Sequence, residues 1–313
     1  MFKVLITDYP WPDLALERKM LKCIDAELIE PAGASEAELI AAVPDVDAVL
    51  TTWANVSSNV LAAASKCQIV SRMGIGLDNI DLEYCRESGI TVTNVPSYCE
   101  IEVAEHTLAL IFSLGRKVAQ FHLQTKANTY DLQAGPLLRR MEGQTLGIVG
   151  LGSIGSVVAN KAAALGLNVQ YHNRSPKESP YLYVESLDEL LRTSDYISLH
   201  VPLNDDTRQM IGRAELQAMK PTGYLINTSR GGLLDHKALT LALQHNEIAG
   251  AALDVQDQEP PDLATLPYRL ENVIVTPHAA FLSVESLELL RIQAVEQVVA
   301  KLSGNTPKHT VIG

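Results

Sequence analysis

Short apolar runs recur along the first third of the chain, and segments with apolar positions at helical spacing separate them. Runs of this length without polar alternation are typical of parallel strands that are buried on both faces. Strands are expected over residues 4–7, 26–29, 48–51, 68–71 and 91–95. Helices are expected over residues 13–23, 35–42 and 57–64, and the segment 82–87 lies between the last two strands. Repeated strand–helix units predict a parallel, doubly wound α/β sheet.

A long helical pattern then runs from residue 100 to about residue 122, after a break that Pro96 marks. A second series of apolar runs predicts strands over residues 147–149, 169–171, 196–199, 224–227, 250–253 and 273–275. A last helix, over residues 284–302, is expected to return to the first sheet. Two domains are therefore predicted, one of them discontinuous: residues 1–98 with 281–313, and residues 99–280. Residues 125–136 are loop-like.

The strand at the start of the second series leads into the pattern Gly-x-Gly-x-x-Gly at residues 150–155, and a helical segment follows. This context is typical of a dinucleotide-binding turn. Gly150 permits the tight turn, Gly152 lets the backbone approach a pyrophosphate, and Gly155 lets helix and strand pack closely. The alternative interpretation is a structural glycine turn.

The end of the next strand indicates which dinucleotide binds. An NAD enzyme places Asp or Glu there, about 20 residues after the turn, to bind the ribose 2′-hydroxyl. This chain has Asn173, Arg174 and Ser175 instead, with Lys177 nearby. The Arg174 guanidinium could bind a 2′-phosphate through two hydrogen bonds. NADP(H) is therefore the expected cofactor, with NAD(H) as the second choice. The alternative is a solvated Arg and Lys in a surface loop.

Composition narrows the function classes. The chain has 313 residues, of which 47% are hydrophobic and 20% charged, as in globular proteins with an ample core. Its net charge of −12 argues against sequence-independent binding to nucleic acid or to an anionic membrane. The four cysteines are far apart in the sequence, which argues against disulfides and against a metal site. The first apolar run is too short for a signal peptide or a membrane span, so a cytoplasmic protein is expected.

Reactive side chains follow three successive predicted strands of the second series. They are Arg230, Glu259 and His278. In doubly wound sheets, ligands bind outside the carboxyl ends of the strands, so these three side chains could converge on one cleft. The alternative is that each makes a separate structural contact.

The segments around these residues read NTSRGG at 227–232, DVQDQEP at 254–260 and TPHAA at 276–280. With RMGIGLDNID at 72–81 and the glycine turn, they give a chain that resembles the D-isomer-specific 2-hydroxyacid dehydrogenase family over essentially its whole length. Within the family, it is most similar to the branch of the C-terminal-binding proteins and their bacterial relatives. The resemblance implies a flavodoxin-like substrate domain, a Rossmann cofactor domain, and hydride transfer between a nicotinamide and C2 of a 2-oxo acid.

The resemblance assigns catalytic roles that the chemistry of the residues supports. A cationic imidazole at His278 would protonate the alkoxide formed from the ketone, and Glu259 would hold the ring and favour its charged form. Arg230 would bind the substrate carboxylate through its planar fork and polarise the C2 carbonyl. Backbone amides of Ile75 and Gly76 would also bind that carboxylate. Taken singly, the three side chains could instead be a structural histidine, a surface cation and a rim carboxylate.

Other contacts follow from position in the family. Cofactor contacts are implied for Ser153, Ile154, His200, Val201, Pro202, Thr207, Thr228 and Asp254. Arg72 could bind a second anionic group of the substrate, or form a salt bridge after its strand. Phe281 stands where the C-terminal-binding branch carries Trp, which changes the wall of the substrate pocket. His106, on the long helix, is interpreted as structural.

The expected activity is NADP(H)-dependent reduction of a 2-oxo acid of the glyoxylate or hydroxypyruvate type to a D-2-hydroxy acid. The alternative is a nucleotide-sensing regulatory scaffold that resembles the C-terminal-binding corepressors, and the intact catalytic set favours the enzyme. The family implies a homodimer through the cofactor domain. Four residues of the long helix are expected at its interface because they cover more than one helix face: Val103, Leu110, Ile111 and Leu114.

Overall fold

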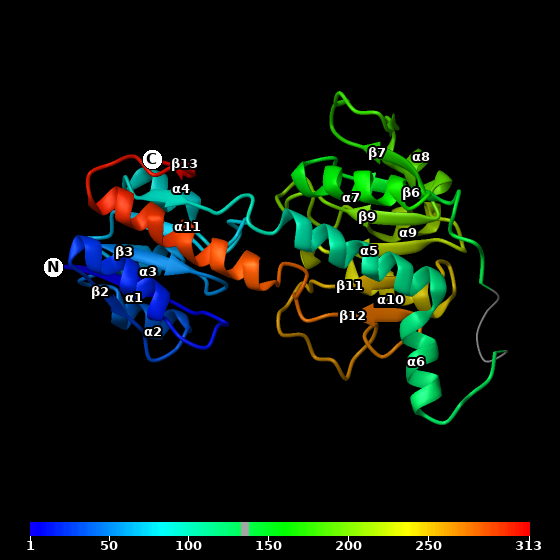
Figure 1. Cartoon of the computed structure of the whole chain (residues 1–313), viewed down its shortest axis with the longest axis horizontal. Coiled ribbons are helices and arrows are strands. Elements are labelled where there is room, and N and C mark those ends of the chain that lie inside the picture. The colour runs from blue at the N-terminus through cyan, green and yellow to red at the C-terminus, as the bar shows by residue number, and fades with distance from the viewer. Residues whose placement is uncertain (133–137) are drawn as a thin grey trace. The chain divides into compact units, whose positions relative to one another are not determined.

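The computed structural model describes residues 1–132 and 138–313. They form two compact units, and each has its own sheet (Figure 1). Unit 1 comprises Met1–Tyr98 and Ser283–Gly313, and unit 2 comprises Cys99–Leu282. The chain thus returns to unit 1 after residue 282, where the sequence placed the crossing after residue 280.

Within the described residues, unit 1 contains a six-stranded sheet in the order β13-β5-β4-β3-β1-β2. The strands are β1 (Phe2–Ile6), β2 (Ala26–Ile29), β3 (Ala48–Thr51), β4 (Ile69–Arg72), β5 (Thr91–Thr93) and β13 (Thr310–Ile312). The first five strands are parallel in the flavodoxin-like order, as the fold-class prediction requires. The edge strand β13 pairs antiparallel with β5, and the sequence did not indicate it.

Helices cover both faces of this sheet. They are α1 (Ala15–Leu21), α2 (Glu36–Ala42), α3 (Ser58–Ala63), α4 (Leu82–Glu87) and α11 (Val284–Leu302), with the 3-10 turn η1 (Lys22–Ile24). The Ser35 side chain caps α2 in a capping box with Glu38. Helix α11 packs beside α1, where Arg291 forms two hydrogen bonds with the buried carboxylate of Glu17, each 2.7 Å long. This ion pair fixes the returning segment to the rest of unit 1.

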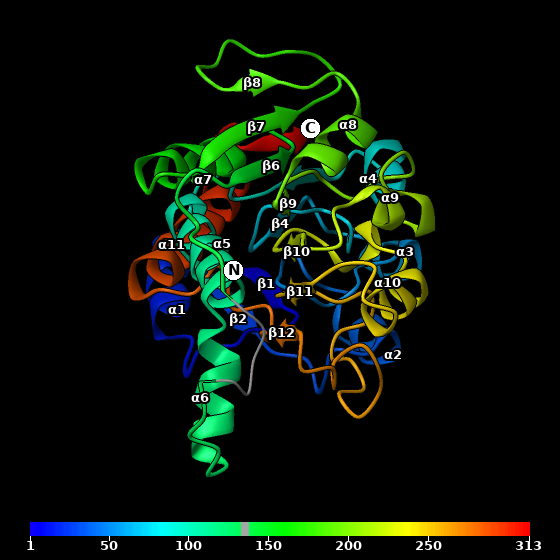
Figure 2. The same cartoon turned by 90° about the vertical axis from the view of Figure 1, so that its right-hand side faces the viewer.

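Unit 2 contains a parallel sheet with seven described strands in the Rossmann order β12-β11-β10-β9-β6-β7-β8. The strands are β6 (Thr145–Val149), β7 (Asn168–His172), β8 (Leu182–Tyr183), β9 (Tyr196–Leu199), β10 (Tyr224–Asn227), β11 (Gly250–Leu253) and β12 (Val273–Val275). The helices are α5 (Glu100–Arg116), α6 (Val118–Lys126), α7 (Ser153–Ala164), α8 (Leu187–Thr193), α9 (Arg213–Ala218) and α10 (His236–Gln244), with the 3-10 turn η2 (Gly231–Leu233). Helices α5 and α7 lie together on one face, and α8, α9 and α10 lie on the other (Figure 2).

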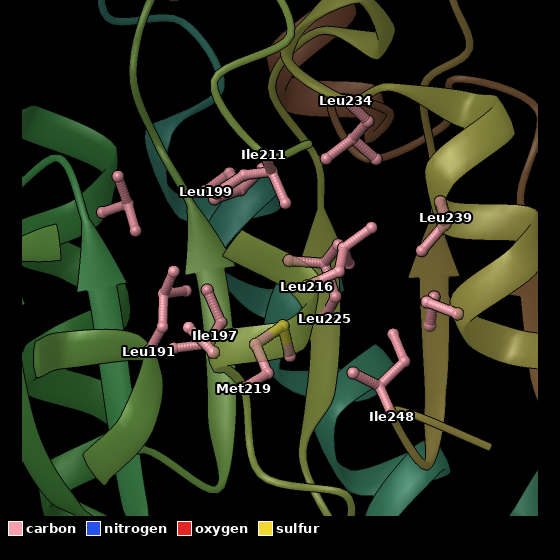
Figure 3. Close-up of a cluster of buried hydrophobic side chains, with 14 of the residues drawn as sticks. Leu191, Ile197, Leu199, Ile211, Leu216, Met219, Leu225, Leu234, Leu239 and Ile248 are labelled. Atoms are coloured by element: carbon pink, nitrogen blue, oxygen red, sulfur yellow. The ribbon is translucent and has the colours of Figure 1, made fainter. Parts of the chain in front are cut away.

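The core of unit 2 forms because both faces of its central strands are apolar. Figure 3 shows the cluster that β9, β10 and their neighbours make with α8, α9 and α10. Ile197, Leu199 and Leu225 are fully buried there. Full burial of such a side chain contributes about 1.5–3 kcal/mol. This packing fixes the strands, and the strands in turn fix where the loops at their ends begin.

The long helix expected from residue 100 to about 122 is in fact two helices. Helix α5 ends at Arg116, and α6 begins at Val118 after Lys117 takes a left-handed φ of 56°. Lys117 is 7% exposed, and its ammonium lies 5.1 Å from the centre of the Tyr224 ring. Helix α6 ends at Lys126, inside the segment 125–136 that was expected to be a loop, and residues 133–136 of that segment lie outside the described residues.

The residues expected at a dimer interface are also placed differently. Val103, Leu110, Ile111 and Leu114 are buried within unit 2, because α5 is covered by α7 on one side and by the sheet on the other. None of the described helices combines the length and the apolar character that a membrane span requires.

Candidate functional site

The loops that follow the parallel strands of unit 2 lie along one edge of the sheet and contact one another. The Gly150 amide donates to the His172 carbonyl at 2.9 Å. The Asp254 amide donates to the Asn227 carbonyl at 3.0 Å, and the His278 amide donates to the Asp254 carbonyl at 2.8 Å. The structure therefore brings the segments singled out in the sequence to a common edge.

The glycine turn after β6 depends on the absence of side chains at two positions. Gly150 has a φ of 98°, and a Cβ there would lie 2.6 Å from the His200 carbonyl oxygen. A Cβ on Gly155 would overlap the Gly150 carbonyl oxygen. The turn, the start of α7 and the loop after β9 can pack this closely only with glycine at both positions.

The start of α7 fits a dinucleotide pyrophosphate. Gly152 precedes the helix, and a Cβ there would meet no described atom within 4 Å. Among the described residues, no side chain caps this helix. The backbone amides of Ser153 and Ile154, in its first turn, are therefore the donors that a phosphate at a helix N-terminus requires.

The loop after β7 presents the residues expected to choose between NADP and NAD. Asn173 Oδ1 accepts a hydrogen bond of 2.7 Å from the Leu151 amide, so this side chain joins the loop to the glycine turn. Arg174 and Ser175 are exposed. The Tyr171 hydroxyl bonds both the amide and the carbonyl of Lys177 at 2.9 Å, which closes the loop on itself.

The loop after β9 is held by its own polar groups. Burial lowers the pKa of His200 to about 4, and its Nε2 lies 2.8 Å from Ser198 Oγ. His200 is partly buried, and its imidazole is held by this contact with Ser198. Val201 is partly buried, and Pro202 beside it is exposed. The Thr207 hydroxyl donates to the Pro202 carbonyl at 2.7 Å and so closes this loop.

Asn227, at the end of β10, shapes the segment that carries Arg230. Its Nδ2 donates to the Arg230 carbonyl at 2.9 Å, and its Oδ1 accepts from the Ser229 amide at 3.0 Å. Gly231 packs directly on the next loop, because a Cβ there would overlap the backbone of Gln256. The Arg230 segment and the segment leading to Glu259 therefore hold each other in place.

Glu259 and His278 form a close pair. His278 Nδ1 lies 2.7 Å from Glu259 Oε2, and the Gln256 amide donates to Glu259 Oε1 at 2.7 Å. A carboxylate only accepts hydrogen bonds, so Nδ1 carries a proton. The His278 side chain is 25% exposed and the Glu259 side chain is 30% exposed. The Gln256 amide thus orients Glu259, and the pair remains accessible to a ligand.

Asp254 holds the segment that carries His278. Its carboxylate is 1% exposed and accepts hydrogen bonds from the amides of Ala279 and Ala280, both at 2.9 Å. The His278 backbone has a φ of 54°, which is uncommon for a residue other than glycine. The Phe281 ring, 8% exposed, packs edge-on against the His278 ring. A cofactor contact was expected for Asp254, but its hydrogen bonds to the segment after His278 were not.

Helix α5 contributes a contact that the sequence did not indicate. The Thr107 hydroxyl, fully buried on α5, lies 2.9 Å from the hydroxyl of Thr228. A buried threonine on a core helix gives no signal of this kind in the sequence, because its partner is 121 residues away.

Unit 1 carries the glycine loop after β4. The Asn94 Nδ2 donates to the Ile75 carbonyl at 2.8 Å, which orients the loop that also contains Gly76. Arg72 is 7% exposed, its Nε donates to Asn79 Oδ1 at 3.1 Å, and its guanidinium also bonds the Met73 carbonyl. This burial favours a role for Arg72 in supporting the loop over one in binding a second anionic group.

Among the residues that the structure describes, no group of three or more His, Cys, Asp and Glu side chains is arranged to hold a metal ion.

The chain is similar to dehydrogenases and reductases of 2-hydroxy and 2-oxo acids. A glyoxylate reductase of Aeropyrum pernix is 38% identical over 284 residues, which cover 87% of this chain and 85% of that protein. A D-3-phosphoglycerate dehydrogenase of Methanocaldococcus jannaschii is 35% identical over 99% of this chain. The chain spans 59% of the length of that relative.

Solved structures are similar over the whole chain. A D-lactate dehydrogenase of Aquifex aeolicus, complexed with NAD and lactic acid, superposes with a TM-score of 0.91 at 31% identity, and 99% of each chain is covered. An NADPH-dependent glyoxylate/hydroxypyruvate reductase of Sinorhizobium meliloti, in complex with NADP and malonate, has a TM-score of 0.87 at 27% identity. That match covers 99% of this chain and 96% of the reductase.

Residues 108–280 match the family described as D-isomer specific 2-hydroxyacid dehydrogenase, NAD binding domain. This segment includes the glycine turn, the Arg230 segment and the Glu259–His278 pair. The match to the family does not extend to its branch of C-terminal-binding proteins, which stays a prediction. The fold of both units, the relatives and this match lead to one conclusion: the chain is an enzyme of the D-isomer-specific 2-hydroxyacid dehydrogenase family.

Proposed function

We propose that this enzyme reduces a small 2-oxo acid to the D-2-hydroxy acid, with His278 as the general acid. The observation that carries the proposal is the contact of 2.7 Å between His278 Nδ1 and Glu259 Oε2, on the same sheet edge as the Arg230 segment. When bound, a nicotinamide dinucleotide supplies the hydride that reduces C2 of the substrate. The residues of this chain bind the acid, polarise its carbonyl and supply the proton.

His278 would give the proton from Nε2, because Nδ1 donates to Glu259. The Glu259 carboxylate, fixed by the Gln256 amide, stabilises the imidazolium before the proton is transferred. The Arg230 guanidinium would bind the substrate carboxylate and stabilise the developing alkoxide.

A small substrate of the glyoxylate or hydroxypyruvate type is proposed because relatives with these activities match most of this chain. The test is a panel of 2-oxo acids of increasing C2 substituent, each mixed with the purified enzyme and NADPH or NADH. Consumption of the reduced cofactor is followed by its absorbance. Turnover with at least one small acid supports the proposal, and an inactive panel with both cofactors contradicts it.

NADP(H) is the proposed cofactor, because Arg174 and Ser175 are exposed at the end of β7, where an NAD enzyme carries a carboxylate. Wild type should therefore show a higher kcat/KM with NADPH than with NADH. Arg174→Ala should raise the KM for NADPH about 10- to 100-fold and leave the KM for NADH nearly unchanged, because only the 2′-phosphate would lose its charge-assisted bonds.

Lys177→Ala serves as the matched control, since it removes an exposed cation from the same loop. Equal or better use of NADH by the wild type would contradict the proposed preference. An equal loss with both cofactors in Arg174→Ala would show that this residue acts on the loop and not on the phosphate.

The proposed assembly is a homodimer formed through α6 and the start of α5. This surface consists of Ile101, Val118 and Leu123, whose exposed fractions are 58%, 59% and 66%. Helix α6 extends away from the sheet of unit 2 (Figure 1), so Val118 and Leu123 are not covered by that sheet, and Ile101 is exposed at the other end of α5. Exposed apolar side chains on such a helix are typical of an association surface.

Light scattering of the wild type at micromolar concentration should give the mass of a dimer. Leu123→Lys should shift the species toward the monomer, because a charge buried in an apolar interface is costly. Leu241→Lys, an exposed leucine on α10 of the same unit, should leave the mass unchanged. A monomeric wild type would contradict this assembly.

A further inference from the structure

His106 lies outside the catalytic set, on α5, yet it reaches the segment that carries His278. Its Nε2 is 3.1 Å from Thr276 Oγ1 and 3.5 Å from Asp254 Oδ1. Thr276 is the first residue after β12, and His278 follows two positions later. No spacing or motif in the sequence connects this helix with the general acid.

The direction of the hydrogen bonds follows from the chemistry of the three groups. The Thr276 hydroxyl lies 2.5 Å from Asp254 Oδ1, and an ionised carboxylate can only accept, so the single hydroxyl proton points to Asp254. Thr276 Oγ1 must then accept from His106, which requires a proton on Nε2. The result is a relay of two bonds from α5 to the buried carboxylate, in which each bond polarises the next.

Asp254 needs this support. Its carboxylate is 1% exposed, while the His106 side chain, at the other end of the relay, is 24% exposed. A buried carboxylate without compensating donors is strongly destabilised, and it moves toward water or takes up a proton. The donors that Asp254 has are the Thr276 hydroxyl and the amides of Ala279 and Ala280.

Asp254 also fixes the backbone at His278 and directly after it. The amides of Ala279 and Ala280 bond its two oxygens, and the His278 amide bonds the Asp254 carbonyl. These bonds hold His278 at its left-handed φ of 54°, a conformation that costs free energy unless the surroundings impose it. A change at Asp254 is thus passed directly to the general acid.

We infer that His106 is a positioning residue of the enzyme: through Thr276 and Asp254 it fixes the segment that aims His278. The inference rests on the proposed function, in which His278 donates the proton. His106 touches neither substrate nor cofactor in this account, so its loss should lower kcat more than it weakens binding.

The test compares His106→Leu with His106→Gln, whose amide group keeps a donor. His106→Leu should lower kcat about 10- to 100-fold, the effect of one misplaced polar contact, while the dissociation constant for NADPH changes less than about twofold. His106→Gln should recover most of kcat. His245→Leu, an exposed histidine at the end of α10, is the control and should behave as the wild type.

A double-mutant cycle with Thr276→Val separates the relay from a general loss of packing. If both side chains act through one chain of bonds, the double variant should be no slower than the slower single variant. Additive losses, or a His106→Leu enzyme with unchanged kcat, would overturn the inference. Thr276→Val also keeps the inference testable if His106→Leu does not fold, since it breaks the same relay with a side chain of equal shape.

A readout without turnover distinguishes this inference from the proposed function. The rate at which diethyl pyrocarbonate modifies His278, followed by mass spectrometry, should rise in His106→Leu and return toward the wild-type rate in His106→Gln. An unchanged rate in His106→Leu contradicts the positioning role even if the enzyme reduces 2-oxo acids. If the modification rate changes in His106→Leu while the wild type reduces no 2-oxo acid, the relay is upheld and the proposed chemistry is rejected.

Discussion

His278→Ala should lose most of its turnover and retain its cofactor. General acid catalysis by a positioned side chain is worth about 10²- to 10⁴-fold, so kcat should fall by that range. The loss should appear in kcat and not in the affinity for NADPH. The glycine turn and α7 follow β6, whereas His278 follows β12, the edge strand of the same sheet. The measurements are steady-state kinetics with the best acid of the panel and cofactor binding by fluorescence.

His245→Ala provides the control, because this histidine is exposed and outside the site. A His278→Ala enzyme that keeps more than about a tenth of the wild-type kcat would show that another group supplies the proton. A parallel loss of NADPH binding would instead show that His278 supports the cofactor site.

Gly231→Ala should damage both the fold of the site and its activity. A Cβ at this position would overlap the backbone of Gln256 and approach the amide of Asp257. Because both are backbone atoms, they cannot rotate away, and the segments that carry Arg230 and Glu259 must separate. Overpacking of this kind costs about 1–3 kcal/mol of stability. Displacement of catalytic groups by about an ångström lowers the rate about 10²-fold.

The matched control is Gly212→Ala in the same unit, where a Cβ would make an ordinary contact of 3.4 Å with the Glu215 side chain. Thermal unfolding and kcat/KM should be close to wild type in the control, and both should be reduced in Gly231→Ala. Wild-type kinetics in Gly231→Ala would mean that the two segments are not locked together as described.

The strands were predictable because buried strands appear in the sequence as short runs of apolar residues. The expected and observed bounds coincide for β2, β3, β9, β10, β11 and β12, and β3, β9 and β11 are buried at every position. Two short strands gave no such signal: β8 has two residues and β13 has three, and both lie at an edge of their sheet. Their pairing depends on the neighbouring strand more than on their own composition.

The break between α5 and α6 could not be read from the sequence. A left-handed residue that ends a helix is usually glycine or asparagine, whereas this chain has Lys117. Burial lowers the pKa of this lysine, and its ammonium lies over the Tyr224 ring. Such a contact joins two parts of the chain that only the tertiary structure brings together.

The site shows the same division. The identities of Arg230, Glu259 and His278 could be inferred, because their chemistry suits the reaction and they follow successive strands. The groups that hold them could not: Asn227 and Asp254 act on backbone amides and carbonyls, which are the same in every sequence. A side chain that bonds the backbone of a distant segment leaves no pattern in spacing or composition.

The most direct test of the central claim is the chirality of the product. The wild-type enzyme is incubated with hydroxypyruvate and NADPH, and the glycerate formed is separated on a chiral column. Hydride transfer at a site of this family, with Arg230 fixing the carboxylate and His278 the oxygen, should give the D enantiomer alone. Formation of the L enantiomer or a racemic mixture, or the absence of any hydroxy acid from each member of the panel, would contradict the account.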